Sequence, residues 1–497
     1  MTIQRSAGVL LHPTCLPSRF GIGDLGPAAY AYLDWLAAAG VRWWQILPLN
    51  LPGPGNSPYS ALSTFAGNPL LISPEGLAGD GLLTEEELAA LSALAADRVD
   101  YPSVSTAKTG LLRRAWQRFS EAPPTGLEAE LSAFAAEHGW WLEEFAQFDA
   151  LKRAHVGAAW YEWPEKGLRL HDERVVTAWA AAHPDEIGFS RFCQFVFFRQ
   201  WERVHRAARE RGIRILGDAP IFVAYDSAEV WAHRELFLMD EHGRPTVVAG
   251  VPPDYFSATG QRWGNPLYDW ERHAADGYAW WIARLRHLAS LSDAVRLDHF
   301  RGFAAHWEIP AAEDTAVNGR WVRGPGRQLF DAVGEALGGL PFVAEDLGTI
   351  TEDVHQLRRA LGLPGMAILQ FAFTPAPRSS YLPHNLAPDL VVYTGTHDNN
   401  TTVGWWLEDA AEAERDFARR YMATDGREIH WDLVRLALAT VCDLAVVPHQ
   451  DLAGLGSDCR MNTPGRADGN WTFRLMPWML DVDIQQRLAG LVDLYGR

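Results

Sequence analysis

The sequence contains little cysteine, which limits the kinds of site that it can form. Only four of its 497 residues are cysteines, and they lie far apart with no C-x-x-C spacing. Neither a disulfide framework nor a zinc site is therefore expected. A low cysteine content fits a reducing compartment, and we expect a cytoplasmic protein.

Long apolar runs are missing as well. No stretch approaches the ~20 apolar residues that a membrane-spanning helix requires. Near the N-terminus, the apolar run Ala7–Leu11 is interrupted at once by His12 and Pro13, which makes it too short for the core of a signal peptide. We therefore expect no membrane as a partner.

Basic residues are fewer than acidic ones, 44 against 62, and the formal net charge is −18. Such a charge opposes binding to the phosphate backbone of nucleic acids and to anionic lipid surfaces. A neutral substrate is favoured instead. Aromatic residues are plentiful, with 22 tryptophans, and flat aromatic faces suit sugar rings, although most of them are expected in the core.

The apolar runs that do occur are short, and their number predicts an α/β barrel. They are β-branched or aliphatic, are bounded by Gly, Pro, Asp or Asn, and are separated in several places by helical patterns. Eight can be counted: Gly8–His12, Trp43–Leu47, Ile213–Gly217, Ala294–Leu297, Phe342–Ala344, Ala367–Phe371, Leu390–Tyr393 and Leu444–Val447. Eight parallel strands close a (β/α)8 TIM barrel, so residues 1–497 are expected to form one domain of this class.

Two long segments are expected as insertions into that barrel, because the chain is about twice the ~250 residues of a typical one. Residues 50–211, after the second predicted strand, are far too long for an ordinary connection, and their patterns are mainly helical. Residues 222–270, after the third strand, include a dense Gly, Pro and aromatic stretch. We expect a helical subdomain in the first segment and an active-site loop region in the second.

Three acidic residues follow three of the predicted strands. Asp298 follows the fourth run, Glu345 follows the fifth, and Asp398 lies a few residues beyond the seventh. Barrel enzymes assemble their sites at the C-terminal ends of the strands. Glycoside chemistry is the reaction class that most needs clustered carboxylates without a metal. The sequence therefore predicts a glycosidase-type site at this end of the barrel.

Asp298 lies two residues after Arg296, so both side chains are expected on the same face of a strand. A guanidinium beside the carboxylate favours the ionised form, which a glycosidase nucleophile requires. The alternative is a buried pair that only stabilises the strand end. The nucleophile is favoured because two further acids occupy equivalent positions.

Glu345 and its neighbour Asp346 compete for the role of general acid. Apolar neighbours on one side and carboxylates on the other are expected to raise the pKa of Glu345 and keep it protonated near neutrality. The alternative for an acid at this place is to stabilise the start of the next helix, which Asp346 can do equally well. We assign the acid to Glu345 and a structural role to Asp346.

Asp398 is expected to contact ring hydroxyls and to hold a distorted sugar. Its neighbour His397 could be a structural histidine, as most lone histidines are. Asp218 follows the third predicted strand and reaches the same end of the barrel. For Asp218, orienting the Arg–Asp pair is at least as well supported as contact with the substrate.

Two familiar patterns are set aside. Gly21–Gly26 matches G-x-G-x-x-G, but no strand runs directly into it, Pro27 follows, and no acid lies about 20 residues beyond. None of the 17 histidines forms H-E-x-x-H or a comparable metal spacing. We expect neither a dinucleotide nor a metal, and no cofactor.

With these residues assembled, the sequence closely resembles the amylomaltases, the bacterial 4-α-glucanotransferases of the α-amylase-like clan. The resemblance covers essentially the whole chain. The stretches that carry it are Gly8–Pro13, Phe20–Gly26, Ser57–Ser60, Phe65–Leu70, Gly217–Phe222, Gly250–Tyr268, the three acid motifs, Met461–Arg466 and Gly469–Trp471.

The resemblance implies a single catalytic barrel that disproportionates α-1,4-glucans by a retaining double displacement. In that scheme Asp298 is the nucleophile, Glu345 the acid/base and Asp398 the transition-state stabiliser. The expected donors and acceptors are maltooligosaccharides and fragments of starch or glycogen. The residues expected to bind them are Ser57, Tyr59, Asp218, Arg296, His299, His397, Asp254, Tyr255, Gln261, Trp263, Asn265 and Phe371.

Two other functions remain open from the residues alone. An α-glucan hydrolase of the same clan would use the same three acids and deliver water to the intermediate. A non-catalytic glycan-binding protein would keep the barrel and the aromatic residues. The intact acids and Arg296 argue against the binding protein, and the resemblance of the Gly250–Tyr268 loop favours the transferase.

Overall fold

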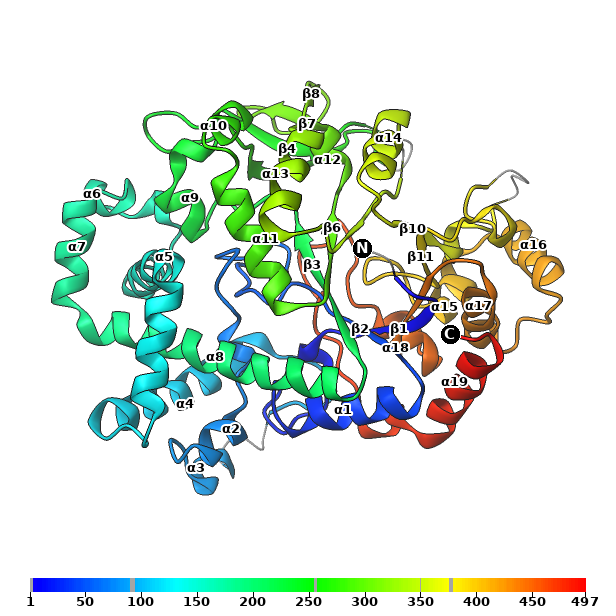
Figure 1. The fold of residues 1–497 in the computed structure, drawn as a ribbon, viewed down its shortest axis with the longest axis horizontal. Coiled ribbons are helices and arrows are strands. Elements are labelled where there is room, and N and C mark those ends of the chain that lie inside the picture. The colour runs from blue at the N-terminus through cyan, green and yellow to red at the C-terminus, as the bar shows by residue number, and fades with distance from the viewer. Residues whose placement is uncertain (1–2, 90–93, 254–256, 349, 375–378) are drawn as a thin grey trace.

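The computed structural model describes residues 3–89, 94–253, 257–348, 350–374 and 379–497. Eight parallel strands form the centre, in the spatial order β10-β11-β12-β1-β2-β3-β6-β9 (Figure 1). Their bounds are β1 Ser6–Leu10, β2 Trp43–Gln45, β3 Arg214–Pro220, β6 Ala294–Asp298, β9 Phe342–Ala344, β10 Gly365–Ile368, β11 Leu390–Tyr393 and β12 Leu444–Pro448. The predicted (β/α)8 barrel is confirmed.

The seam between β9 and β10 closes the barrel with few contacts. The Ala344 amide donates to the Pro364 carbonyl at 2.8 Å. Beside this bond, the Met366 amide donates to Oδ1 of Asp346 at 2.8 Å, and Nε of Arg358 lies 3.2 Å from its Oδ2. Asp346 therefore holds the seam together, whereas its neighbour Glu345 points elsewhere.

Six of the eight predicted strands end at other residues in the structure, and the difference is largest, three residues, in two of them. The run Ala367–Phe371 is strand only as far as Ile368, because the partner strand β11 ends at Tyr393, opposite Ile368, and a short 3-10 turn follows. The third strand instead continues to Pro220, because β6 pairs with it as far as Asp298. Asp218 therefore lies within β3, not after it.

Helices surround the barrel strands. Those next to the strands in the chain are α1 Pro27–Ala38, α8 Pro184–Glu210, α11 Ala279–Leu291, α13 Arg327–Leu337, α14 Glu352–Ala360, α16 Glu412–Met422, α17 Ile429–Ala439 and α19 Val482–Leu494, with the short α12 Arg301–Ala304, α15 Thr402–Gly404 and α18 His449–Leu452. Between β10 and β11, the described residues form only the turns Leu369–Phe371 and Pro383–Asn385. Among its described residues, this unit of the barrel therefore has no α-helix.

The segment between β2 and β3 is mainly helical. It contains α2 Pro74–Gly79, α3 Glu85–Ala89, α4 Tyr101–Glu121, α5 Leu127–Ala154, α6 Lys166–Arg169 and α7 Glu173–Ala182, and it ends with α8. At the start of α3, the amide of Thr84 donates to Glu87 at 2.9 Å and the Glu87 amide donates back to the Thr84 hydroxyl at 3.3 Å. Two otherwise unpaired amides are satisfied by this exchange.

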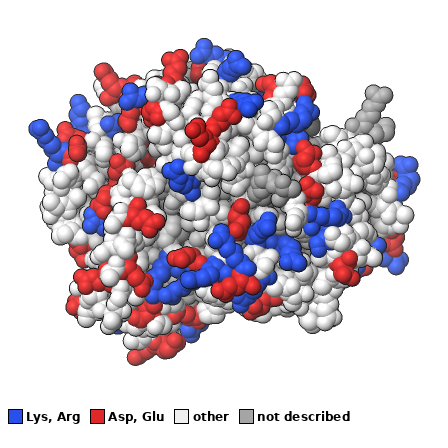
Figure 2. Space-filling view, viewed as in Figure 1, with Lys and Arg blue, Asp and Glu red and all other residues white. Residues whose placement is uncertain are grey.

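Ion pairs form within this segment and between it and the barrel. Arg199 of α8 pairs with Asp80 of the same segment at 2.6 Å, and Arg211, directly after α8, pairs with Asp34 of the barrel helix α1 at 2.7 Å. Figure 2 shows the same face of the molecule as Figure 1, the face on which α8 lies. Acidic and basic side chains are mixed over it. Within the part of the chain that the structure describes, no helix combines the length and apolar character needed to cross a membrane.

A second, four-stranded sheet lies beside the barrel, in the order β5-β4-β7-β8. Its strands are β4 Val247–Val251, β5 Gln261–Pro266, β7 Ala305–Pro310 and β8 Arg320–Arg323, and the helices α9 Ala228–Ala232 and α10 Trp270–Ala275 flank the first two. The sequence predicted a loop region where β4 and β5 lie. Strand β4 forms because it pairs with β7, more than 50 residues later, which a local pattern does not reveal.

Packing, rather than nucleotide binding, explains the G-x-G-x-x-G pattern. A Cβ on Gly23 would lie 2.1 Å from the Pro13 carbonyl, and one on Gly26 would lie 2.4 Å from the Ser73 hydroxyl. Within the pattern, Asp24 pairs with the buried Lys108 of α4 at 3.4 Å. The glycines therefore allow the chain to approach its neighbours closely.

Candidate active site

A cavity of about 350 Å³ opens at the C-terminal ends of the barrel strands. Strands β3, β5 and β6 contribute to it, together with the loops that follow β2, β11 and β12. Its lining residues are Ser57, Tyr59, Pro220, Ile221, Phe222, Gln261, Trp263, Asn265, Asp298, His299, His397, Asp398, Asn462, Pro464, Gly465 and Trp471. Two of the three predicted acids, Asp298 and Asp398, thus face the same space.

Arg296 links the carboxylates of Asp218 and Asp298 at the floor of the cavity. Its Nη1 donates to both oxygens of Asp218, at 2.9 and 2.8 Å, and its Nη2 lies 2.7 Å from Oδ1 of Asp298. Strands β3 and β6 set this arrangement, because Asp218 lies directly opposite Arg296 in their register. Burial raises the pKa of Asp218 to about 7; Arg296 opposes that rise and the charge of Asp298 adds to it.

Tyr59 joins this cluster to the loop after β11. Its hydroxyl donates to Oδ2 of Asp218 at 2.8 Å. The ring stacks on His397, with centroids 5.0 Å apart and planes 11° from parallel. Burial lowers the pKa of His397, which keeps the imidazole neutral near pH 7. The first long segment of the chain therefore supplies one wall of the cavity.

Glu345 approaches from β9, just beneath His299. The backbone amides of His299 and Leu347 donate to its two oxygens, at 2.8 and 3.0 Å. Burial raises the pKa of Glu345 to about 7, and the charge of Asp298 adds to this effect, while Arg296 and the two amides oppose it. A carboxyl with this pKa can donate a proton near neutrality.

His299 adopts a backbone conformation that side chains rarely take, with φ of +52°. Such strain is stored only where the surroundings enforce it, and it concentrates at functional sites. Here the conformation directs the His299 amide at Glu345 while the ring lines the cavity. Burial lowers the pKa of the imidazole to about 4, so the ring is neutral.

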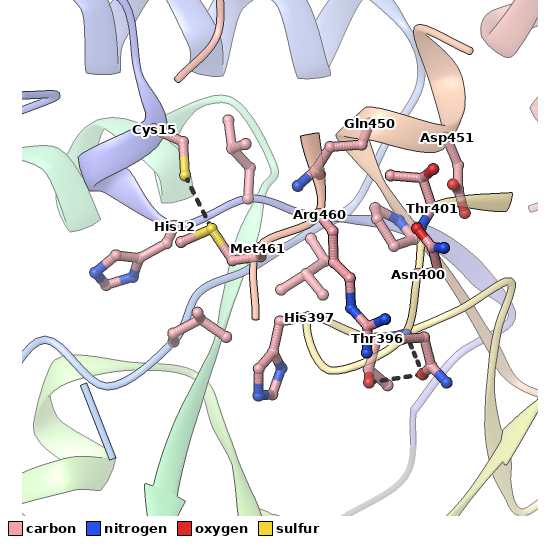
Figure 3. Close-up of a pocket in the computed structure, with 15 residues that line it drawn as sticks. His12, Cys15, Thr396, His397, Asn400, Thr401, Gln450, Asp451, Arg460 and Met461 are labelled. Atoms are coloured by element: carbon pink, nitrogen blue, oxygen red, sulfur yellow. Dashed lines mark hydrogen bonds between the residues drawn. The ribbon is translucent and has the colours of Figure 1, made fainter. Parts of the chain in front are cut away.

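Asp398 is held at the opposite wall by residues that follow β12. Nδ2 of Asn462 donates to its Oδ1 at 2.6 Å, and Arg460 donates to its backbone carbonyl at 2.6 Å. Nε2 of His397 lies 3.4 Å from the second carboxylate oxygen. Figure 3 shows the pocket behind this loop, with His397 and Thr396 on one side and Arg460 and Met461 close by.

Strand β5 supplies an aromatic rim. The edge of Trp263 meets the ring of His299, with centroids 4.8 Å apart and planes at 81°, and 39% of the tryptophan remains exposed. Its indole N–H donates to Gln261 at 3.1 Å. Asn265 donates to the Val223 carbonyl at 2.8 Å, which fixes the end of this strand.

A family model described as 4-alpha-glucanotransferase matches residues 11–480. The chain belongs to this family. The 4-alpha-glucanotransferases of Thermus thermophilus and Synechocystis are 48% and 46% identical to it, with all of this chain and 99% or more of each relative covered. The family and enzyme class predicted from the sequence are confirmed, and the chain is a 4-alpha-glucanotransferase.

Solved structures agree with this assignment. An amylomaltase from Streptococcus agalactiae in complex with acarbose superposes with a TM-score of 0.96 at 35% identity, and the match covers 99% of this chain and all of that one. An amylomaltase from Corynebacterium glutamicum shares the fold, with a TM-score of 0.79 at 21% identity over 98% of this chain and 75% of the other.

The predicted site residues of this 4-alpha-glucanotransferase fall into four groups. Nine line the cavity: Ser57, Tyr59, Gln261, Trp263, Asn265, Asp298, His299, His397 and Asp398. Asp218, Arg296 and Glu345 lie beneath that lining and contact it. Phe371 is exposed, packs against Tyr381 and is not among the residues that line the cavity. Asp254 and Tyr255 lie outside the described residues.

Sequence reasoning missed the part of the 4-alpha-glucanotransferase site that follows β12. Asn462, Pro464, Gly465 and Trp471 line the cavity, and Asn462 binds Asp398 directly. Their stretches carried the family resemblance but contain no acid that would mark them as chemical. A polar residue next to a Pro-Gly turn after a barrel strand is the signal that could have found them.

Proposed function

We propose that this 4-alpha-glucanotransferase disproportionates α-1,4-glucans by a retaining double displacement, with Asp298 as nucleophile, Glu345 as acid/base and Asp398 as transition-state stabiliser. The observation that carries the proposal is the difference between the first two carboxyls. Asp298 contacts a guanidinium, whereas Glu345 is held by two backbone amides and its desolvation raises its pKa to about 7. Two carboxyls in such different settings suit an ionised nucleophile and a protonated acid.

In the first step, Glu345 protonates the glycosidic oxygen while Asp298 attacks the anomeric carbon. The C–O bond breaks, the fragment with the reducing end leaves as an alcohol, and a glycosyl ester forms on Asp298. Arg296 remains bound to Asp218 throughout, which holds Asp298 in one orientation. Asp398 lies across the cavity and can bind sugar hydroxyls as positive charge develops on the ring.

In the second step, the 4-hydroxyl of an acceptor glucan attacks the ester. Glu345, now ionised, takes the hydroxyl proton, and Asp298 leaves as a carboxylate. Two inversions at one carbon give net retention, for which the two carboxyls are expected to lie ~5–5.5 Å apart. Donors and acceptors are proposed to be maltooligosaccharides and fragments of starch or glycogen.

Transfer requires that a sugar reaches the intermediate before water does. Trp263 and Gln261 on β5 are proposed to cover the ester and to form the platform on which the acceptor lies. The exposed indole face and the adjacent amide offer stacking and hydrogen bonds to a sugar ring.

A cytoplasmic location is also proposed, and it rests on the low cysteine content of the sequence.

Incubation of the purified protein with maltotriose tests the proposal. Glucose is expected to appear together with maltooligosaccharides longer than the substrate, while the number of reducing ends stays constant. A product mixture of only glucose and maltose, with rising reducing ends, would instead assign a hydrolase. The three single variants Asp298→Asn, Glu345→Gln and Asp398→Asn then test the assigned roles.

A further inference from the structure

Asp451 is a buried carboxylate that the proposed reaction does not use. It lies on α18, directly after β12, and only 1% of its surface is exposed. Burial raises its pKa, and the neighbours that oppose this rise are Thr394 and Thr402, which are both neutral. Burying a carboxylate costs free energy that neutral hydrogen bonds offset only in part, so its presence here requires an explanation.

Three hydrogen bonds reach the two oxygens of Asp451. The hydroxyl of Thr394 donates to Oδ2 at 2.6 Å, and the hydroxyl of Thr402 donates to the same oxygen at 2.8 Å. The amide of Thr402 donates to Oδ1 at 2.7 Å. Every one of these contacts needs an acceptor, and an ionised carboxylate offers acceptors only.

These two threonines lie at the two ends of the loop that contains Asp398. Thr394 follows β11 immediately, and Thr402 is the first residue of α15. Asp451 therefore holds both ends of this loop on one carboxylate. Figure 3 shows Asp451 beside Thr401, on the opposite side of the pocket from His397.

Other contacts fix the middle of the same loop. Arg460 donates to the backbone of Asp398, and Asn462 donates to its carboxylate. Gln370 donates to the carbonyl of Asn400 at 2.9 Å. The loop is therefore held at its ends by Asp451 and at its centre by Gln370, Arg460 and the cavity residue Asn462.

We propose that Asp451 is a positioning residue, which sets the placement of Asp398 by holding the ends of its loop. The inference rests on the proposed role of Asp398 in the transfer reaction. A displacement of about 1 Å at a reacting group can cost on the order of 10² in rate. Loss of the three contacts is therefore expected to lower kcat, with KM nearly unchanged because the other cavity residues stay in place.

Asp451→Asn is the sharpest single change, because it keeps the shape and replaces one acceptor oxygen with an amide that donates. At least one N–H or O–H group of Thr394 or Thr402 then faces the N–H groups of the new side-chain amide. We expect kcat for transfer from maltotriose to fall by about 10- to 100-fold. Asp432→Asn on α17 is the matched control, because its carboxylate also accepts from a threonine hydroxyl, at 2.5 Å from Thr424, but away from the cavity.

A double-mutant comparison separates positioning from general stabilisation. If Asp451 acts through Asp398, adding Asp451→Asn to Asp398→Asn should change the residual rate little. Independent effects would multiply instead. Multiplying effects, or a wild-type kcat in Asp451→Asn, would overturn the inference. A wild-type rate in Asp398→Asn alone would instead contradict the proposed function, so the two failures are distinguishable.

Thr402→Val provides a second test in case Asp451→Asn does not fold. This change removes one hydroxyl donor and keeps the backbone bond, and Thr402→Ser restores the hydroxyl. We expect Thr402→Val to lower kcat and Thr402→Ser to recover it, at matched thermal unfolding midpoints. Equal kcat in these two variants would count against the positioning role.

Discussion

Two buried charge clusters of this molecule differ in how completely they are satisfied. Lys108 and Asp24 have side chains that are only 2% and 4% exposed, and they form a balanced pair. The remaining lysine donors reach the carbonyls of Leu70 and Ile72, at 2.7 and 2.9 Å. This cluster joins α4 to the N-terminal part of the barrel, and all three donors of the Lys108 ammonium are used within the protein.

The cluster at the C-terminal ends of the strands is unbalanced. Arg296 serves two carboxylates, and the side chain of Asp298 is 30% exposed to the cavity. Its carboxylate is thus held by a cation yet remains accessible to a substrate. The comparison teaches that the structural cluster completes its contacts inside the protein, whereas the cluster proposed for catalysis keeps a charged atom available to the cavity.

The largest expected effect comes from Asp298→Asn, which removes the proposed nucleophile from the Arg296 cluster. Removal of a covalent nucleophile is expected to lower kcat by on the order of 10⁴-fold or more. The thermal unfolding midpoint should change little, because Arg296 keeps both contacts to Asp218. Transfer from maltotriose and a thermal melt measure the two quantities, and substantial residual activity would remove Asp298 from its role.

The structural cluster should show the opposite behaviour in Lys108→Met. This change leaves Asp24 buried without its cation, which typically costs about 3–5 kcal/mol of unfolding free energy. The folded fraction should keep its kcat. Denaturant unfolding gives the free energy, and Asp24→Asn combined with Lys108→Met should recover most of the loss. A stable single variant would show that the ion pair contributes little.

The dependence of kcat/KM on pH tests the proposed role of Glu345. Glu345 must be protonated to act as the acid, and its pKa is about 7, so kcat/KM should fall about tenfold per pH unit above that value. A glycosyl fluoride donor needs no proton on its leaving group, and the alkaline decline of the first step should disappear with it. If the decline persists with this donor, another group controls it, and Asp218 is the next candidate.

The smallest expected effect concerns the rim of the cavity. Trp263→Ala should raise the ratio of hydrolysis to transfer by a few fold, because water then reaches the intermediate more easily. The ratio follows from reducing ends and chain lengths in one maltotriose reaction. Trp321→Ala on β8 is the matched control, since its exposed indole is not part of the cavity lining. An unchanged ratio in Trp263→Ala would contradict the covering role.

Much of the fold could be predicted because the barrel strands are short apolar runs, buried on both sides. Each strand can be recognised from its own short stretch of sequence, and the acids that follow the strands mark one end of the barrel. Strand ends were less predictable. Residues 369–371 form a turn and β3 extends to Pro220, because the neighbouring strands determine where pairing stops.

Residue patterns alone indicated site residues only at strand ends. The family resemblance supplied others that line the cavity, namely Ser57, Tyr59, Gln261, Trp263 and Asn265. Asp298, Glu345 and Asp398 follow predicted strands, and Arg296 shares a face with Asp298 by simple alternation. Asn462 gave no such signal, because it meets Asp398 from a segment 64 residues later. The pairing of β4 with β7 escaped for the same reason.

The sequence by itself determined the class of fold and the family, and it supplied the three acids that we propose for catalysis, since apolar patterning and short motifs are local properties. The tertiary structure alone decided how these acids differ. Burial and the charge of Asp298 raise the pKa of Glu345. The guanidinium of Arg296, which is bound to Asp218, contacts Asp298. Solvent exclusion and the distances between charges depend on segments that meet only after folding, and these set what each carboxyl can do.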